Sequence, residues 1–576
     1  MSSRKPQKIL WLTTLISTAA LGAVTACGDD SDDDGGGSET GGSGGRGGSS
    51  GSNNGGSSGS TTGGTSGAAG EGGAGTGGSS GRGGTAGQGG TAGSATGGAG
   101  GEPGGAGGDD GLGGEGGGGG EPITYWPNGV TANGISATVD DRFHGVAVDG
   151  QNNVYAAGYL GEGVVTSGTT RQVVVAKYGS NGQLVNGFGA QGLALADLST
   201  YAGLPDDTTT TASDPDPSQE TARDVALQSD GKIVVAGVVE RLGGTPDRNT
   251  PLDIFVMRFD TAGVRDNTFN AAGTIPGLQI LNPNANSTNP LVYGISIDST
   301  NRIYVFAHGN ATHATRTDQD RYVYRLNADG TLDGNFGPGG FYTFDTPTLA
   351  LNDNVRRGAV LANGTVVISG YTNVAGRNQI VLARATTAGI ADATFSGDGI
   401  VRLAPFPLGM AECYGVAVQS DGSIVTTGYG NVDTERGTTS NFLDMVSFRV
   451  RANGTVDSTW AGNGGLAYDV NSGEDRGRAI MALADDRILV AGGGSPTATD
   501  KDPLLLLLDE DGLVAEDFDP SGRKLYGAFG STGDEFYALA RTPGSAGVVA
   551  AAGYAPTGGS VTNGNGLLAI LPIPAN

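Results

Sequence analysis

The chain has 576 residues, of which 109 are glycine and 36% are hydrophobic, and its 33 basic and 59 acidic side chains give a net charge of −26. Such a charge argues against nucleic acid and anionic lipid headgroups as partners of the folded part, because both repel an acidic surface.

Residues 1–26 have the pattern of a secretion signal, with three basic residues ahead of an apolar run that ends near Val24. The run is too short to span a bilayer comfortably, which takes about 20 residues. Its end, "VTAC", resembles a bacterial lipobox, and the resemblance implies that Cys27 is lipidated and anchors the mature chain in a lipid bilayer. An ordinary signal peptide with an incidental cysteine is the alternative. Gly28 is not the aspartate that retains some lipoproteins at the inner membrane, so we expect an outer-membrane anchor, with the protein facing the periplasm or the cell surface.

Residues 27–121 are rich in Gly, Ser, Thr and Ala and show no apolar period. Such a segment buries too little surface to offset the loss of chain entropy, so we expect a disordered, Gly-rich tether. A Gly-rich coil of this length has an end-to-end distance of roughly 50 to 60 Å. A tether of this kind behind a lipobox resembles lipoproteins of myxobacterial type in composition.

Residues 122–576 repeat one pattern seven times, in which an apolar strand, a tight turn and a second strand lead to a glycine. The closing glycines are Gly158, Gly237, Gly309, Gly370, Gly428, Gly492 and Gly553, at intervals of 58 to 79 residues. Copies one to six add a third strand, a Gly turn with an aromatic residue and a short fourth strand, as in "RYVYRLNADGTLDGNFGPGGFYTF". A regular period of this kind indicates a repeat architecture.

The strands are near-continuous apolar runs, so we expect each sheet to be covered on both faces. Short sheets stacked face to face and joined by Asp-Gly and Asn-Gly hairpins are what propeller blades require, and the predicted fold is an all-β, seven-bladed β-propeller. "ALQSDGKIVVAG" and "RLNADGTLDGNFGPGG" resemble the delta-60 repeat of bacterial surface and secreted proteins. The resemblance covers about residues 134–570, supports the propeller and brings no catalytic residues.

The ends of the repeat domain predict how the ring closes. Copy seven stops just after its third strand, "GLLAILPIPAN", and lacks a fourth. Residues 126–141, "WPNGVTANGISATVDD", contain a corner and a short strand before copy one. We therefore expect Ile135–Val139 to pair with Leu567–Leu571 and to complete the seventh sheet, which covers an otherwise open edge.

Motifs that carry chemistry elsewhere have structural explanations here. "GFGAQG" at residues 187–192 fits a dinucleotide fingerprint in letters only, because it forms a corner between strands rather than a strand-to-helix turn. His144 before a first strand, His308 at the end of a second and His313 in a loop lack metal-ligand spacing, so we expect structural histidines. Cys413 abuts a strand, and we expect a buried, unreactive thiol.

The variable connections point to a binding face. The first-to-second and third-to-fourth connections are tight hairpins, so the variable second-to-third and fourth-to-first connections share the opposite face of an antiparallel blade. Long loops on a rigid scaffold commonly carry binding residues, although drift in loop length is the alternative. The candidate binding residues are Arg171, Arg241, Asp247, Arg248, Asp318, Asp320, Arg377, Asp433, Arg436 and Asp502. We expect charge reversals at Asp318 and Asp320, or at Arg436, to weaken binding and to leave stability nearly unchanged.

Three functions remain open at this point. The leading hypothesis is a lipid-anchored cell-envelope protein whose propeller binds a glycan, a peptide or a protein on the loop-rich face. The alternatives are a propeller-type lyase or hydrolase that uses carboxylates and a calcium ion, and an architectural envelope protein without a small ligand. We favour a non-enzymatic monomer, expect no cofactor, name no catalytic residue, and leave calcium and any metal ligands open.

Overall fold

The computed structural model describes residues 7–8, 130–132 and 141–573, with gaps of which 199–219, 241–251, 282–289 and 433–441 are the longest. The expected signal peptide and tether fall outside the described residues, apart from the two-residue strand β1 (Gln7–Lys8), which pairs with an outer strand. The described elements are strands and one short 3₁₀ helix, η2 (Trp460–Gly462). No helix among these residues is long and apolar enough to cross a membrane.

The described strands form seven antiparallel sheets, six of four strands and one of five, and each sheet has an inner, a second, a third and an outer strand. The inner strands are β3 (Asp141–Val148), β7 (Thr221–Leu227), β11 (Leu291–Ile297), β15 (Asp353–Val360), β19 (Ala411–Val418), β23 (Arg476–Ala482) and β27 (Glu535–Arg541). The second strands are β4 (Val154–Val165), β8 (Ile233–Glu240), β12 (Ile303–Thr312), β16 (Val366–Val374), β20 (Ile424–Gly430), β24 (Ile488–Thr497) and β28 (Val548–Thr557).

The third strands are β5 (Gly168–Tyr178), β9 (Leu252–Phe259), β13 (Thr317–Leu326), β17 (Arg377–Ala385), β21 (Asp444–Val450), β25 (Asp500–Leu508) and β29 (Ser560–Pro572). The outer strands are β6 (Leu193–Ala196), β10 (Leu278–Leu281), β14 (Phe341–Phe344), β18 (Ile400–Leu403), β22 (Leu466–Tyr468), β26 (Arg523–Leu525) and β2 (Val130–Ala132). β1 lies along the free edge of β22.

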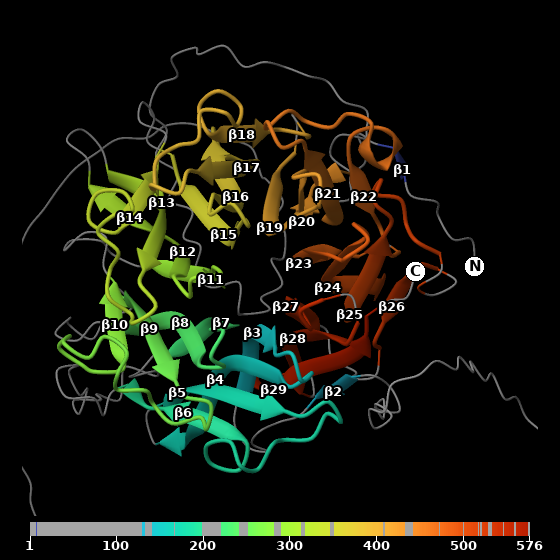
Figure 1. Cartoon of the computed structure of the whole chain (residues 1–576). Coiled ribbons are helices and arrows are strands. Elements are labelled where there is room, and N and C mark those ends of the chain that lie inside the picture. The colour runs from blue at the N-terminus through green and yellow to red at the C-terminus, as the bar shows by residue number, and fades with distance from the viewer. Residues whose placement is uncertain are drawn as a thin grey trace, which may run out of the picture. The chain divides into compact units, whose positions relative to one another are not determined.

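Each inner strand contacts the inner strands of both neighbouring sheets, and β27 contacts β3, so the sheets close into a ring around an axis (Figure 1). The predicted seven-bladed β-propeller is confirmed. The blades are numbered one to seven from the sheet that begins with β3.

An N-terminal strand completes the seventh blade. β2 pairs antiparallel with β29, with Val130 opposite Ala569 and Ala132 opposite Leu567. The predicted type of closure is therefore present, but the predicted strand is wrong, because the pairing segment lies five residues earlier than Ile135. Residues 135–139 themselves lie outside the described part of the chain.

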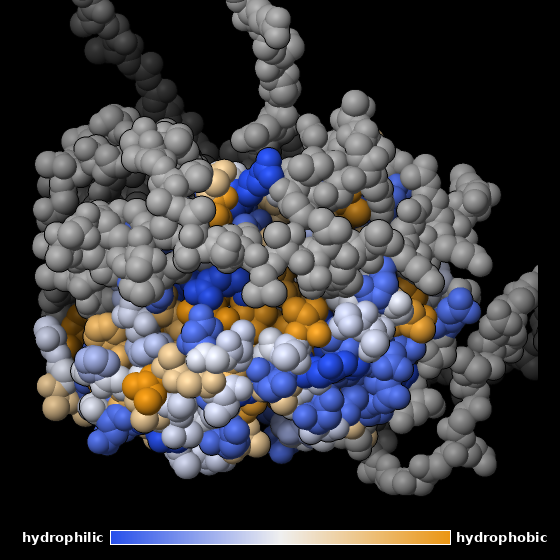
Figure 2. All heavy atoms as spheres, turned by 90° about the horizontal axis from the view of Figure 1, so that it is seen from above, coloured by the Kyte–Doolittle hydropathy of each residue, from blue (hydrophilic) through white to orange (hydrophobic). Residues whose placement is uncertain are grey.

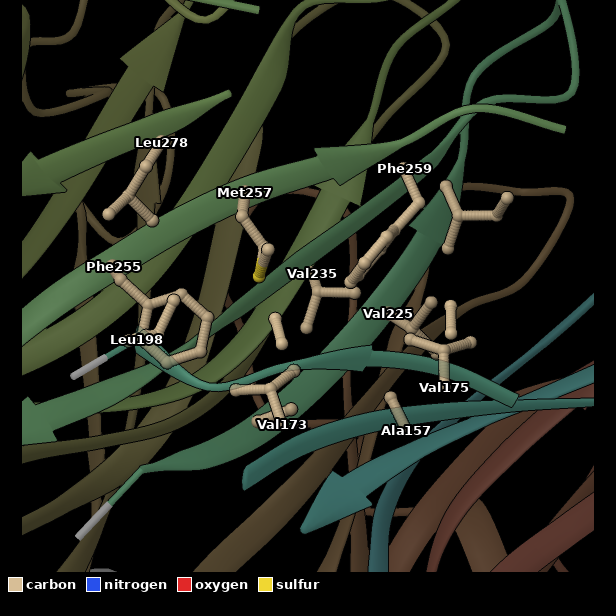
Figure 3. Close-up of a cluster of buried hydrophobic side chains, with 14 of the residues drawn as sticks. Ala157, Val173, Val175, Leu198, Val225, Val235, Phe255, Met257, Phe259 and Leu278 are labelled. Atoms are coloured by element: carbon tan, nitrogen blue, oxygen red, sulfur yellow. The ribbon is translucent and has the colours of Figure 1, made fainter. Parts of the chain in front are cut away.

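Apolar side chains fill each interface between neighbouring blades. Between blades one and two, Val173 and Val175 face Val235 and Met257, all fully buried (Figure 3). The other six interfaces contain equivalent clusters. Because each strand is covered on both faces, its sequence is apolar throughout rather than alternating. On the side of the molecule in Figure 2, apolar residues reach the described surface in patches between hydrophilic ones.

A repeated arginine joins each of four blades to the next. In blade three, Arg325 donates to Asp333 at 2.8 Å, lies 4.6 Å from the ring centre of Phe336 and donates to Thr387 O of blade four at 2.6 Å. The equivalent arginines of blades two, four and five are Arg258, Arg384 and Arg449. We call these four residues the staple arginines.

The glycine in the third-to-fourth corner also lies at the interface between neighbouring blades. Gly330 of blade three has φ +87°, and a Cβ there would lie 2.6 Å from Phe269 of blade two. The turn therefore needs glycine both for its backbone conformation and for its close approach to the neighbouring aromatic ring.

Candidate functional site

The two faces of the ring differ as the sequence predicts. One face, the hairpin face, carries the first-to-second turns, such as residues 228–232, and the third-to-fourth corners, such as 327–340. The opposite, loop-rich face carries the second-to-third and fourth-to-first connections. Strand order alone fixes this separation, because successive strands in each blade run in opposite directions.

The candidate binding residues divide into three groups. Arg241, Asp247, Arg248, Asp433 and Arg436 lie outside the described residues, and the side chain of Arg171 does so as well. Arg377 is exposed at the start of β17 on the loop-rich face. Asp318, Asp320 and Asp502 lie at the same face but are buried.

Burial contradicts one expectation about the aspartates. Asp320 is 1% exposed, and Asp318 accepts a hydrogen bond from Leu351 N at 3.2 Å. Charge reversal at either position would place a cation in a buried site, so it would reduce the stability of the fold. Both residues lie near the start of β13, next to Leu351 and Asn352 at the end of the fourth-to-first connection, and strand periodicity did not reveal that contact.

Asp318, Asp320 and Asp345 form an acidic cluster in blade three, with one carboxylate oxygen of each within 4.8 Å of the others. Oxygen ligands of this type suit calcium. Clusters of acidic groups are common without an ion, so the cluster leaves calcium binding open.

The residues expected to be structural lie in structural positions. Cys413 is fully buried, its Sγ donates to Gly370 O at 2.9 Å, and burial raises the pKa of the thiol to about 11. His308 is buried in β12, and burial together with nearby Arg356 lowers its pKa to about 3, so the ring is neutral. Residues 187–192 form the corner between β5 and β6, as predicted.

Every inner strand contains a β-bulge at the same position, and the bulge places one extra residue next to the axis. The bulged residues are His144, Arg223, Tyr293, Arg356, Tyr414, Arg478 and Tyr537, in blades one to seven. A bulge turns a side chain away from the regular alternation of the strand. Since each inner strand enters from the loop-rich face and the bulge is near its start, these residues lie toward that face. We call them the axial belt.

Arginine and tyrosine alternate around the axial belt. Arg356 lies 4.7 Å from the ring centre of Tyr293 and 4.6 Å from that of Tyr414, and Arg478 lies 4.6 Å from Tyr414 and 5.8 Å from Tyr537. His144 then stacks on Tyr537 at 5.7 Å. Cation–π contacts of this kind are worth about 0.5 to 2 kcal/mol each. Six blades are thus connected through side chains at the axis.

His144 had been expected before the first strand, and the structure corrects this. It is the bulged residue within β3, and its carbonyl oxygen accepts a hydrogen bond from Arg357 at 3.2 Å. The sequence places the start of the strand too late because the extra residue of the bulge interrupts the run of apolar residues.

Arg357, next to the bulge of blade four, reaches across the axis. Its guanidinium contacts Asp224 of blade two at 2.7 Å and donates to the carbonyls of His144 in blade one and Tyr537 in blade seven. Asp224 also accepts from Ile295 N of blade three at 3.0 Å. Burial raises the pKa of Asp224 and Arg357 opposes this. This pair links five blades at the level of the axial belt.

Other charges near the axial belt are paired in blades six and seven. Arg478 donates to Glu535 at 2.7 Å, and Lys501 donates to the other oxygen of Glu535 at 2.6 Å. Burial favours the neutral acid, but the two cations outweigh it and hold the pKa of Glu535 below its ordinary value. The carboxylate is therefore charged and committed to these partners.

The class of protein that this geometry defines is a repeat-built, seven-bladed β-propeller with a polar axial belt. Three segments, residues 228–269, 300–336 and 361–395, match the model of a family described as "Domain of unknown function (DUF5122) beta-propeller". Each segment runs from the first hairpin of a blade to the buried aromatic residue of its corner, in blades two, three and four. The match supports placing the chain among the propeller repeat proteins.

Solved structures resemble this chain in fold. An unknown function protein from Dyadobacter fermentans DSM 18053 is 14% identical, with a TM-score of 0.36 over 61% of this chain and 93% of that one. The polysaccharide lyase Uly1 is 11% identical, with a TM-score of 0.43 over 79% and 93%. PorZ of Porphyromonas gingivalis, a surface component of the type-IX secretion system, is 14% identical, with a TM-score of 0.33 over 75% and 46%. Values this low carry no argument about function. No curated protein matches the sequence significantly.

Proposed function

We propose that this protein is a lipid-anchored cell-envelope protein whose propeller binds a glycan, a peptide or a protein partner on its loop-rich face. The observation that carries the proposal is the axial belt, whose residue type changes from blade to blade while the bulge that presents it is constant. The backbone therefore does not require these particular side chains, and a ligand would explain them.

A glycan array probed with the purified full chain, with and without chelator, tests the binding role. We expect binding that chelator leaves unchanged. Arg377→Glu at the exposed edge of the loop-rich face should weaken it, whereas Lys232→Ala in a hairpin on the opposite face should not. Greater damage from Lys232→Ala would show that the face is wrong.

The anchor is a separate part of the proposal and rests on the sequence "VTAC". Replacing Cys27 with Ala should release the protein from the membrane fraction without unfolding the propeller. Membrane association that survives both the substitution and a carbonate wash would refute the lipid anchor.

An enzyme is the second candidate function, since the cluster of Asp318, Asp320 and Asp345 brings three carboxylates together. A melting temperature that falls on chelation, combined with cleavage of a polysaccharide that chelator abolishes, would favour a calcium-using lyase or hydrolase over a binding module.

A further inference from the structure

Two buried arginines between blades three and four differ in how their N–H groups are used. Arg321, 1% exposed, donates to Asn354 O at 2.9 Å and to Tyr371 O at 2.7 Å, and it pairs with Asp353 at 3.1 Å. Its role in holding blades three and four together is clear from these partners.

Arg356 has fewer hydrogen-bond acceptors than Arg321. It is 7% exposed, yet among the described residues its one hydrogen bond is from Nη2 to Tyr371 Oη at 3.3 Å, and its buried Nε has no acceptor. The nearest carboxylate oxygen, on Glu412, is 3.7 Å away and already accepts from Tyr429 at 2.9 Å. A guanidinium carries five N–H donors, and a buried donor without an acceptor costs about 1 to 3 kcal/mol. The guanidinium therefore has a weak ion pair and one long hydrogen bond, and its buried Nε donor has no acceptor among the described residues.

The surroundings of Arg356 indicate what that acceptor is. Its guanidinium lies among the rings of Tyr293, Tyr371 and Tyr414, at 4.7, 5.1 and 4.6 Å from their centres. Tyr293 is partly exposed, as are Arg223 and Tyr537 of the axial belt, so solvent reaches the belt from the axis. A ligand there would meet the exposed part of Tyr293, whose ring also stacks on His308 at 5.4 Å, next to the guanidinium of Arg356.

Two backbone carbonyls at the axis already accept hydrogen bonds, which leaves fewer acceptors for a peptide. The carbonyls of His144 and Tyr537 both accept from Arg357. A peptide main chain needs acceptors for its own N–H groups, whereas a sugar ring can pack an apolar C–H face on an aromatic ring and present a single charged group.

We propose that Arg356 binds the carboxylate of an acidic sugar, a hexuronate unit, with the sugar ring against Tyr293. The planar guanidinium fits a carboxylate through two parallel N–H···O bonds, and burial among the tyrosines strengthens them. This inference rests on the proposed binding function and names its ligand class. A neutral hexose would bring no second negative charge to this guanidinium, whose carboxylate neighbour Glu412 lies 3.7 Å away.

Calorimetric titration of the purified full chain with glucuronate and with glucose tests the ligand class. We expect glucuronate to bind at least tenfold more tightly than glucose, and more tightly than an acetylated dipeptide with a free carboxylate. Equal affinity for the two sugars would overturn the role of the carboxylate. Tighter binding of the dipeptide would overturn the assignment to a sugar.

Substitutions of two arginines test the position. Arg356→Gln should weaken glucuronate binding at least tenfold, and Arg356→Lys should restore part of the loss. Arg384→Gln is the matched control, because Arg384 also lies 4.6 Å from an aromatic ring, that of Phe395, but on the hairpin face. Its glucuronate affinity should equal that of the wild type.

Two further measurements keep the test decisive. Should Arg356→Gln fail to fold, Tyr293→Leu gives a milder change at a partly exposed ring and should weaken glucuronate binding several-fold. Wild-type affinity in either folded variant would overturn the proposal. Glycan-array binding through the loop-rich face that persists in Arg356→Gln, without glucuronate binding to the wild type, would reject this site and leave the proposed function standing.

Discussion

Arg325 among the staple arginines of the hairpin face and Arg356 of the axial belt both lie over aromatic rings, but their polar partners differ. Each staple arginine has an aspartate of its own blade and a carbonyl of the next, as Arg325 has Asp333 and Thr387. Arg356 has tyrosine rings on several sides and one long hydrogen bond.

The difference distinguishes side chains that the fold requires in successive blades from side chains that vary between blades. The staple arginine recurs in four successive blades with the same partners, so it belongs to the folding unit. At the axis, the same bulge presents histidine, arginine or tyrosine, so the fold requires the bulge but not one particular side chain there.

Opening the ring should have the largest effect, since both regions depend on its closure. Deleting residues 122–140 removes β2 from the edge of β29 and should cost several kcal/mol, because ladder hydrogen bonds and their apolar cover are lost. Deleting residues 37–121 is the control and should leave the thermal midpoint unchanged. Equal midpoints for the two deletions would contradict closure by β2.

Substituting one staple arginine should lower the free energy of unfolding by less than opening the ring does, and it should leave ligand binding unchanged. Arg325→Gln leaves Asp333 buried without its cation and should reduce the free energy of unfolding by about 3 kcal/mol. Urea unfolding measures the loss, and Arg377→Gln at an exposed site should change it by less than about 0.5 kcal/mol. Glucuronate affinity of the folded Arg325→Gln protein should match the wild type. A tenfold loss would mean that the two regions are coupled.

Removing the ion pair between Arg357 and Asp224 should lower the stability of the fold by an amount that depends on pH. Without Arg357, burial raises the pKa of Asp224 further, so the variant must either bury a lone carboxylate or bind a proton. Arg357→Gln should therefore be less stable than the wild type by about 1 to 3 kcal/mol at pH 8, and the gap should narrow at pH 5. Thermal midpoints at the two pH values measure this. A gap independent of pH would show that the ion pair is not the source of the stability.

Single carboxylates on the two faces should respond to pH in opposite directions. On the hairpin face, hydrogen bonds from Thr268 and the charge of Arg258 outweigh burial and lower the pKa of Asp266 to about 2. Its stabilising contribution is present above pH 4 and is lost as the pH falls toward 2. On the loop-rich face, burial and nearby Asp500 raise the pKa of Asp502 to about 6.

The charge on Asp502 is therefore unfavourable in the folded state, and stability should fall slightly as the pH rises from 4 to above 6. Asp502→Asn should remove this decline, which we expect to be about 1 kcal/mol or less after solvent screening. Melting curves from pH 2 to 9 measure both the loss of stability at low pH and the decline above pH 4. An unchanged decline in Asp502→Asn would assign it to another group, of which Asp475, with a pKa raised by burial to about 7, is the nearest in kind.

The sequence by itself determined the repeat and the two faces. Glycines such as Gly237 and Gly370 recur because a Cβ at either position would collide with the carbonyl of the adjacent inner strand. The apolar strands are continuous because blades cover both faces, and the unequal loop lengths identify the loop-rich face. These are local constraints that repeat in every blade, so periodicity in one chain reveals them.

Only the tertiary structure decided the axial belt and the site at Arg356. A bulge adds one residue without a recognisable letter pattern, and the belt residues come from seven inner strands that ring closure alone brings together. The same reason explains the register of β2 and the burial of Asp320, since each depends on what another part of the chain places over it. Contacts between residues far apart in sequence are set by packing, which has no period along the chain.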